Sequence, residues 1–189
     1  MIDKSDDEIR LIVHRVVAQF IGAAAQESAA QGPEPAVPAH KIVAIGADHG
    51  GYELKEIIKQ DLATLGYEVL DAGTHSKEPV DYPDPAHEVA RAVSTGSAWR
   101  GIILDGAGIG SCIVANKLPG IRAGLAYDQR SAVNGREHND TNVLTLGAGS
   151  LDANLAKQIV TVWLSTPFGG GRHERRVNKI TAIEKLYAK

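Results

Sequence analysis

Two candidate functional side chains, Asp48 and His49, follow the first predicted strand in a glycine-rich segment. The segment 46–51 has the sequence GADHGG and comes just before a predicted helix. A carboxylate and an imidazole at a helix start can bind a polar ligand, because the first backbone N–H groups there lack partners. In the alternative interpretation, Asp48 only caps the helix and His49 is an exposed loop residue.

A second glycine-rich segment, residues 105–111, has the sequence DGAGIGS and follows the predicted strand 101–104. Glycines at alternate positions allow backbone N–H groups to face an anion or a developing oxyanion. The spacing is neither that of a dinucleotide-binding motif, which needs glycine at Ser111, nor that of a P-loop. Asp105 could act as a general base, since a carboxylate can remove a carbon-bound proton where water is excluded. The alternative is a helix cap or an ordinary loop acid.

Basic side chains form two further candidates toward the C-terminus. His138 stands between a predicted helix and a predicted strand. It could move a proton, because imidazole titrates near neutral pH, or it could be a helix-terminal histidine that the helix dipole favours. Arg172 and Arg176 follow the glycines 169–171 at the start of the last predicted helix. They share one helix face and suit a phosphate, although a solvated basic turn has the same pattern.

Short apolar runs and helical patterns alternate over residues 40–189, and these elements would position the candidate side chains. The predicted strands are 42–45, 68–71, 101–104, 122–125 and 143–146. The predicted helices are 52–65, 85–94, 110–117, 128–137, 153–164 and 174–187. This alternation predicts an α/β, Rossmann-like three-layer sandwich with a five-stranded parallel sheet. In such folds ligands bind beyond the carboxyl ends of the strands, where Asp48 and Asp105 stand.

The first 39 residues have a different pattern. Residues 1–22 are predicted to form an amphipathic helix, because apolar residues recur in steps of three and one from Ile9 to Ile21. Residues 23–39 are rich in alanine and proline and lack large apolar side chains, which predicts a linker. We therefore expect a helix over 1–22, a linker over 23–39 and an α/β domain over 40–189.

Composition and charge exclude several classes of protein. Lys and Arg number 20 against 23 Asp and Glu, a net charge of −3 that argues against a dedicated nucleic-acid or anionic-membrane binder. No apolar run approaches the roughly 20 residues of a membrane span, and the N-terminus does not have a secretory pattern. The single cysteine, Cys112, excludes an intrachain disulfide and a cysteine-rich zinc site, and fits a reducing cytoplasm.

Several segments together resemble one enzyme family. Residues 41–188 are similar to the type B ribose-5-phosphate isomerases and to the related galactose-6-phosphate isomerase subunits, so that 40–189 would be a sugar-phosphate isomerase domain. The stretches that carry the resemblance are 46–49 (GADH), 81–83 (DYP), 106–110 (GAGIG), 115–117 (ANK), 120–122 (GIR), 138–144 (HNDTNVL) and 170–173 (GGRH) with Arg176.

The resemblance implies a reaction and a set of site residues. The family interconverts a phosphorylated aldose and its ketose through an enediolate, with no metal or other cofactor. By resemblance, His138 would assist opening of the furanose ring, and Asp48 and Asn139 would hold sugar hydroxyls. Binding of the phosphate would fall to His49, Arg172 and Arg176. The enediolate oxygen would be stabilised by the N–H groups of Gly106, Ala107, Gly108, Ile109 and Gly110.

Tyr82 is a further substrate-binding candidate, since it could supply a hydroxyl to the ligand. The segment around it could also be only a turn before a helix.

This chain departs from the family pattern at two places. Many members carry cysteine as the proton-abstracting base where Asp105 stands, and another branch has glutamate at the position of Ser111. The only carboxylate at either position here is Asp105, which we therefore predict to be the base. Gly149 stands where many members have an arginine that helps to hold the phosphate.

The resemblance also implies partners and a location. The family is at least dimeric and combines residues of two subunits in each site, which predicts a homodimer or a dimer of dimers in which His138 acts across the interface. Residues 1–22 with their linker resemble the encapsulation peptides that load enzymes into bacterial microcompartments. A helix that packs on its own domain or on a neighbouring subunit is the alternative. We expect a cytoplasmic protein inside a microcompartment, with a shell protein as partner.

The leading hypothesis is an isomerase that interconverts ribose 5-phosphate and ribulose 5-phosphate. One alternative is the same chemistry on a tetrose or hexose phosphate. The other is a non-catalytic protein that binds a sugar phosphate or serves as a scaffold, in which Asp105 replaces a lost base.

Overall fold

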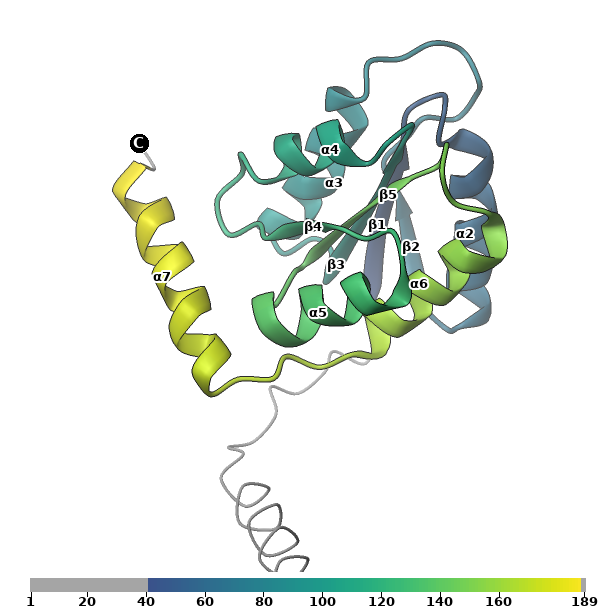
Figure 1. Ribbon diagram of the computed structural model, residues 1–189. Helices are drawn as coiled ribbons and strands as arrows, with labels where there is room; N and C mark the ends of the chain where they lie inside the picture. The colour runs from purple at the N-terminus through teal and green to yellow at the C-terminus, as the bar shows by residue number, and fades with distance from the viewer. Residues whose placement is uncertain (1–40, 188–189) are drawn as a thin grey trace, which may run out of the picture. The chain divides into compact units, whose positions relative to one another are not determined.

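The computed structural model describes residues 41–187, so the predicted helix 1–22 and linker 23–39 lie outside the described residues. Five strands alternate with helices along the domain (Figure 1). In chain order the elements are β1 (Ile42–Ala47), α2 (Tyr52–Thr64), β2 (Glu68–Asp71), α3 (Pro83–Ser94), β3 (Arg100–Asp105), α4 (Ile109–Ala115), β4 (Ala123–Leu125), α5 (Gln129–Asn139), β5 (Val143–Gly147), α6 (Ala153–Ser165) and α7 (Arg172–Tyr187).

The strands form one parallel sheet in the order β2-β1-β3-β5-β4. The central strand β3 is buried at every position, as expected for a strand covered on both faces. Its register with β5 pairs Gly101 with Val143 at one end and Asp105 with Gly147 at the other. The carboxyl end of β3 therefore lies beside the carboxyl end of β5.

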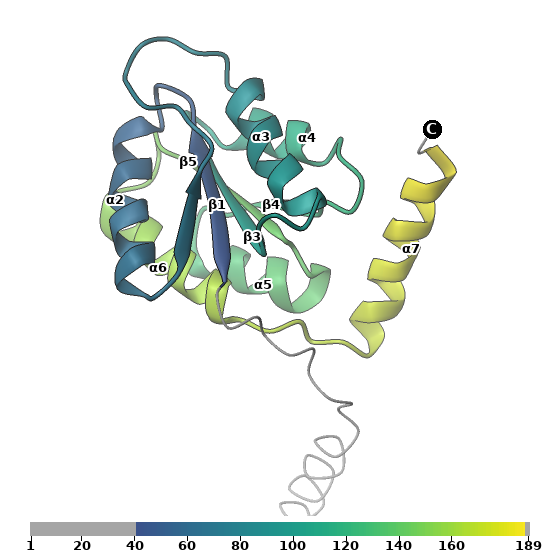
Figure 2. The same ribbon diagram turned by 180° about the vertical axis from the view of Figure 1, so that it is seen from behind.

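Helices cover both faces of the sheet, which confirms the predicted three-layer α/β fold (Figures 1 and 2). On one face a core that includes Ile58, Leu104 and Trp163 packs α2, α5 and α6 against the strands. On the other face a second core, with Val89, Ile103 and Ala115, packs α3 and α4. Burial of these apolar side chains is the main favourable contribution to folding.

Two helix bounds differ from the sequence-based prediction in ways that matter for function. Helix α5 runs to Asn139 rather than to residue 137, so His138 and Asn139 lie in its last turn and not in the connection to β5. Helix α7 begins at Arg172, directly after Gly170 and Gly171, whose φ angles are 58° and 51°. A positive φ favours glycine, which explains why the chain turns there.

Helix α7 leaves the sandwich and contacts α5 (Figure 1). Its exposed large apolar side chains include Ile180, Ile183 and Leu186. Its length and apolarity fall short of a bilayer span, as do those of every other helix within 41–187.

A fully buried lysine ties α2 to the loop that follows β2. The Nζ of Lys55 donates hydrogen bonds to both oxygens of Asp71, at 2.8 and 2.9 Å, and to the carbonyl of Thr74 at 2.6 Å. The N–H of Thr74 in turn donates to the carbonyl of Ala47, the last residue of β1. Lys55 thus holds in place the strand end from which Asp48 and His49 continue.

Replacement of this lysine tests how strongly it holds the loop. The change Lys55→Met should lower the free energy of unfolding by about 3 kcal/mol, because it leaves the carbonyl of Thr74 without this donor and removes the fully buried cation that binds both oxygens of Asp71. Urea denaturation followed by circular dichroism measures the loss.

The matched control is Lys59→Met, which removes a partly exposed lysine that contacts Asp71 but not Thr74. Its cost should be about 1 kcal/mol or less, since a partly solvated ion pair contributes little. Equal losses for the two variants would contradict a special role for Lys55.

Candidate active site

The carboxylate of Asp105 ends β3 and is the most constrained acid of the candidate site. The residue is only 4% exposed. One oxygen, Oδ1, accepts from the N–H of Ala107 at 2.8 Å and from the N–H of Gly108. The other, Oδ2, accepts from the N–H of Ser111 at 3.0 Å and from its hydroxyl at 2.5 Å. Four donors therefore surround one buried carboxylate.

These hydrogen bonds decide the charge of Asp105. Burial by itself would raise the pKa of this carboxyl group. The hydroxyl of Ser111 and the three backbone N–H groups outweigh burial and hold the pKa of Asp105 below its usual range. The side chain is therefore ionised at neutral pH, and it is a weaker base than a carboxylate without such donors.

The same contacts bring together the two positions at which the resembled family places its base. Position 105 and position 111 are in direct contact here, through the 2.5 Å hydrogen bond from Ser111 Oγ to Asp105. A base on either residue would therefore serve the same region of the site. The sequence pattern did not point to Ser111, since a serine near a helix start is common.

The glycine-rich loop presents fewer unpaired donors than the sequence predicts. The carboxylate of Asp105 accepts hydrogen bonds from the N–H groups of Ala107 and Gly108. Within residues 41–187, the N–H groups of Gly106, Ile109 and Gly110 have no acceptor. Three of the five predicted donors thus stay available to a ligand oxygen, because the carboxylate at the end of β3 occupies the other two.

Two glycines allow close approach of neighbouring groups in this loop. A Cβ on Gly110 would lie 2.6 Å from the ring of Tyr82, so the side chain of Tyr82 packs directly on the loop. A Cβ on Gly149 would lie 2.9 Å from the carbonyl oxygen of Gly106, which accepts the N–H of Gly149 at 3.0 Å. An arginine at position 149 would therefore require the loop to move.

Asp48 and His49 lie at the same edge of the sheet as Asp105. The backbone N–H of Asp48 donates to the carbonyl of Leu104, and its side chain accepts from the N–H of Gly51 at 2.9 Å. The hydrogen bond from Gly51 matches the alternative interpretation, in which Asp48 only caps the start of the helix. It engages only one of the two carboxylate oxygens of Asp48. Nδ1 of His49, an exposed residue, lies 3.3 Å from the backbone of Val80.

A second group of candidate residues gathers where α5 ends and α7 begins. The imidazole rings of His138 and His173 are stacked, with centroids 4.1 Å apart and planes 7° from parallel. The guanidinium of Arg172 donates to Nε2 of His173 at 3.3 Å. Burial, followed by electrostatic repulsion from His138, Arg172 and Arg176, lowers the pKa of His173, which is therefore neutral at neutral pH. Two arginines and two imidazoles thus form a basic cluster.

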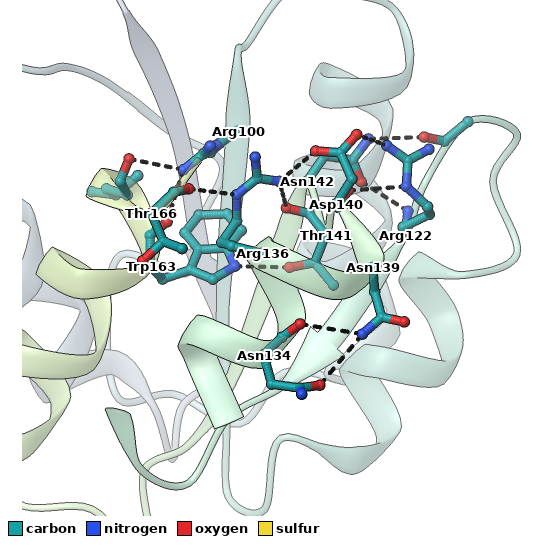
Figure 3. A network of polar contacts seen from close by, with 12 residues as sticks. Arg100, Arg122, Asn134, Arg136, Asn139, Asp140, Thr141, Asn142, Trp163 and Thr166 are labelled. Atoms are coloured by element: carbon teal, nitrogen blue, oxygen red, sulfur yellow. Dashed lines mark hydrogen bonds and ion pairs between the residues drawn. The ribbon is translucent and has the colours of Figure 1, made fainter. Parts of the chain in front are cut away.

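A network of polar contacts holds the end of α5 in place (Figure 3). Asp140 has a left-handed backbone with φ of 47°, which is uncommon for a residue other than glycine. Its carboxylate accepts from Arg136 at 2.8 Å and from Arg122 at 2.6 Å. Arg136 is buried and also donates to the carbonyl of Thr141 at 2.5 Å. These contacts stabilise the turn that ends the helix just after His138 and Asn139.

The two groups of residues lie at opposite edges of the sheet. β5 begins at Val143 beside Gly101 and ends at Gly147 beside Asp105. Four residues of strand span about 13 Å, and His138 lies still farther back along the chain. One copy of the chain therefore brings together Asp48, His49, Tyr82, Asp105 and residues 106–110, and separately His138, Asn139, Arg172 and Arg176.

The sequence did not indicate two residues at this end of the site, one in the basic cluster and one beside it. His173 stands between the two predicted phosphate-binding arginines, and that position was the available signal. Asn134 lies one helical turn before His138, and its side-chain nitrogen is 2.9 Å from Nδ1 of His138. Spacing of four residues on a helix could have indicated this contact.

Comparison with known proteins gives consistent matches. A family model described as Ribose/Galactose Isomerase matches residues 43–180. Ribose-5-phosphate isomerase B of Escherichia coli is 48% identical over 145 residues, which cover 77% of this chain and 97% of that protein. D-erythrulose-4-phosphate isomerase of Pectobacterium atrosepticum is 42% identical over 146 residues, covering 75% and 94%. The solved structure of Clostridium thermocellum ribose-5-phosphate isomerase B has a TM-score of 0.77 at 50% identity, covering 78% of this chain and 99% of that one.

Proposed function

Because this chain belongs to the ribose/galactose isomerase family, we propose that it interconverts ribose 5-phosphate and ribulose 5-phosphate through an enediolate. The class of enzyme, an aldose–ketose isomerase, follows from the family. The position of Asp105 carries the proposed mechanism, since an ionised, buried carboxylate stands beside backbone N–H groups without acceptors in the described chain. Proton transfer between two oxygen-bearing carbons requires such a base and such donors side by side.

In the proposed reaction, Asp105 removes the proton from C2 of the open-chain aldose. The electron pair of that C–H bond forms the enediolate, whose oxygen accepts hydrogen bonds from the N–H groups of Gly106, Ile109 and Gly110. The same carboxyl group then returns the proton to C1, and the hydroxyl proton of O2 moves to O1, which gives the ketose. No atoms or electrons are gained or lost, so the step needs no cofactor.

The basic cluster supplies the other half of the proposed site. His138 assists opening of the furanose ring, and Arg172 and Arg176 bind the phosphate together with His49. Asn139 and Asp48 hold sugar hydroxyls, and Tyr82 supplies a hydroxyl to the ligand. The charges support these roles, because guanidinium groups four residues apart on a helix match the geometry of a phosphate.

A second copy of the chain completes the proposed site. Asp105 and His138 lie at opposite edges of one sheet, so the two side chains of one copy cannot both contact the same small sugar. The exposed side chains of Ile180, Ile183 and Leu186 on α7 and of Ile109 and Ile113 on α4 support an interface between copies. A groove of about 690 Å³, lined by residues of β4, α5 and α7, offers room for a partner side chain. We therefore propose a homodimer, or a dimer of dimers, with shared active sites.

Two alternatives have specific support. The Pectobacterium relative acts on D-erythrulose 4-phosphate according to its name, which favours a tetrose phosphate as the competing substrate over a hexose phosphate. The four hydrogen bonds on Asp105 favour a protein that binds a sugar phosphate without turnover, because they weaken the carboxylate as a base.

Substitution at Asp105 tests the proposed reaction. Asp105→Asn should lower turnover of ribose 5-phosphate by a hundredfold or more, on the order expected for loss of a general base, while calorimetry still detects binding. Asp105→Cys places the family's usual base at this position and should keep turnover within about tenfold of the wild type.

The measurement is NMR of ribose 5-phosphate in heavy water, which follows ketose formation and entry of deuterium at C1 or C2. Wild-type protein that binds the sugar but neither converts it nor exchanges the C2 proton would favour the non-catalytic alternative. Turnover that persists undiminished in Asp105→Asn would contradict the base assignment.

The proposed interface is tested on α7. Ile183→Glu places a charge among apolar side chains and should convert the dimer to a monomer by analytical ultracentrifugation, with loss of most of the activity. Lys185→Glu is the control, since a residue two positions away lies on the opposite side of the helix and should change neither property. An active monomer would contradict the shared site.

We also propose that residues 1–22 direct the enzyme from the cytoplasm into a bacterial microcompartment. The family match begins only at residue 43, which supports a separate role for the segment before it. The sequence supports an apolar stripe that can lie in a groove of a shell protein.

Removal of residues 1–39 should leave the activity unchanged and abolish co-sedimentation with assembled shells. Val13→Glu combined with Val17→Glu, on the predicted apolar stripe, should have the same effect as the deletion, whereas Arg15→Glu on the polar face should not. Loss of the fold on deletion would contradict an independent appendage.

A further inference from the structure

One side chain, that of Asn134, contacts both functional residues at the end of α5. Its Nδ2 lies 2.9 Å from Nδ1 of His138. The side-chain nitrogen Nδ2 of Asn139 lies 3.3 Å from the backbone carbonyl oxygen of Asn134 and 3.5 Å from the side-chain oxygen Oδ1 of Asn134 (Figure 3). The side-chain oxygen of Asn134 therefore faces a donor on Asn139, and its nitrogen faces the imidazole of His138.

This orientation has a consequence for the proton of the imidazole. An amide nitrogen donates hydrogen bonds and cannot accept them, so Nδ1 of His138 must be the acceptor. A neutral histidine that accepts at Nδ1 carries its single proton on Nε2. We infer that Asn134 is a positioning residue that holds His138 as the Nε2–H tautomer, an inference that rests on the proposed ring-opening role of His138.

The stack with His173 fixes the plane of the same ring. His173 is 8% exposed, and Nε2 of His173 accepts from Arg172, so its own ring is held in turn. The two rings lie 4.1 Å apart and nearly parallel. The N–H of Gly169 donates to the carbonyl of Glu137 at 2.9 Å, which ties the segment before α7 to the end of α5. Asn134 thus determines which ring nitrogen of His138 carries the proton, and His173 fixes the plane of that ring.

The tautomer matters for the chemistry proposed above. When the furanose opens, its ring oxygen gains negative charge as the bond to C1 breaks. An Nε2–H group of His138 stabilises that oxygen by donating a hydrogen bond, as a neutral imidazole can do when it acts as an electrophile. The opposite tautomer presents a lone pair at Nε2 and would repel the ring oxygen. Asn134 thus selects the form of His138 that favours opening.

The first test reads the tautomer directly. Two-bond ¹H–¹⁵N NMR spectra of the full-length protein at pH 8 distinguish protonated from unprotonated ring nitrogens, and His138→Gln identifies the signals of His138. In the wild type, Nδ1 of His138 should be unprotonated and Nε2 protonated. Asn134→Asp should reverse this pattern, because a carboxylate accepts from Nδ1–H. A wild-type ring protonated at Nδ1, or a ring whose tautomer is the same in Asn134→Leu and Asn134→Asp, would overturn the inference.

The second test separates ring opening from proton transfer. Ribose 5-phosphate closes into a furanose, whereas an aldotetrose 4-phosphate cannot, since the oxygen that would close its ring carries the phosphate. Asn134→Asp should lower kcat for ribose 5-phosphate by about tenfold or more and leave kcat for erythrose 4-phosphate unchanged. Gln129→Glu adds the same charge to the same helix, where the side chain of Gln129 donates a hydrogen bond to Gln158, and should change neither rate.

The outcomes distinguish this inference from the proposed function. Equal losses for both sugars in Asn134→Asp would show a general structural effect and would overturn the role of Asn134 in ring opening. Wild-type protein that converts neither sugar would contradict the proposed function. The NMR spectra of the unliganded protein would then still decide the tautomer of His138.

Discussion

The direction of the parallel strands determines where chemistry can take place in this chain. Every loop that follows a strand lies at one edge of the sheet, and every segment that leads into a strand lies at the other. Asp48 and Asp105 follow strands, whereas His138 precedes one. The proposed acid–base residues of a single copy are consequently divided between two edges. A reaction that uses both edges depends on an interface between copies, and the exposed apolar side chains of α4 and α7 support the one proposed here.

Buried charge, satisfied by several partners, positions each half of the site. At the carboxyl edge, Asp105 accepts four hydrogen bonds and thereby shapes the loop that follows it. At the other edge, the buried Arg136 binds Asp140, which also binds Arg122, and these contacts stabilise the left-handed turn that ends α5. A charge buried without such partners would cost several kcal/mol, so these networks strongly favour one geometry for the residues beside them.

The departures of this chain from its family are linked in space. The side chain of Asp105 draws the N–H groups of Ala107 and Gly108 toward β3 and contacts Ser111. The carbonyl of Gly106 then lies against residue 149, where only glycine fits without movement. A carboxylate at position 105 and the absence of a side chain at position 149 therefore belong to one arrangement of the loop. In the proposed site, phosphate binding falls to Arg172 and Arg176 at the opposite edge, together with His49.

The sequence by itself determined the elements and their order, because the period of apolar residues and the positions of glycines are local properties of the chain. It also indicated Asp105, His138 and Arg172 by their places at the ends of elements. Only the tertiary structure decided what surrounds them. The sequence placed His138 in a connection, whereas the helix runs past it and its end is stabilised by the contact of Asp140 with the distant Arg122. The stacking of His138 on His173 and the contact of Arg122 with Asp140 depend on distances between segments far apart in the chain, and no spacing along the sequence encodes those distances.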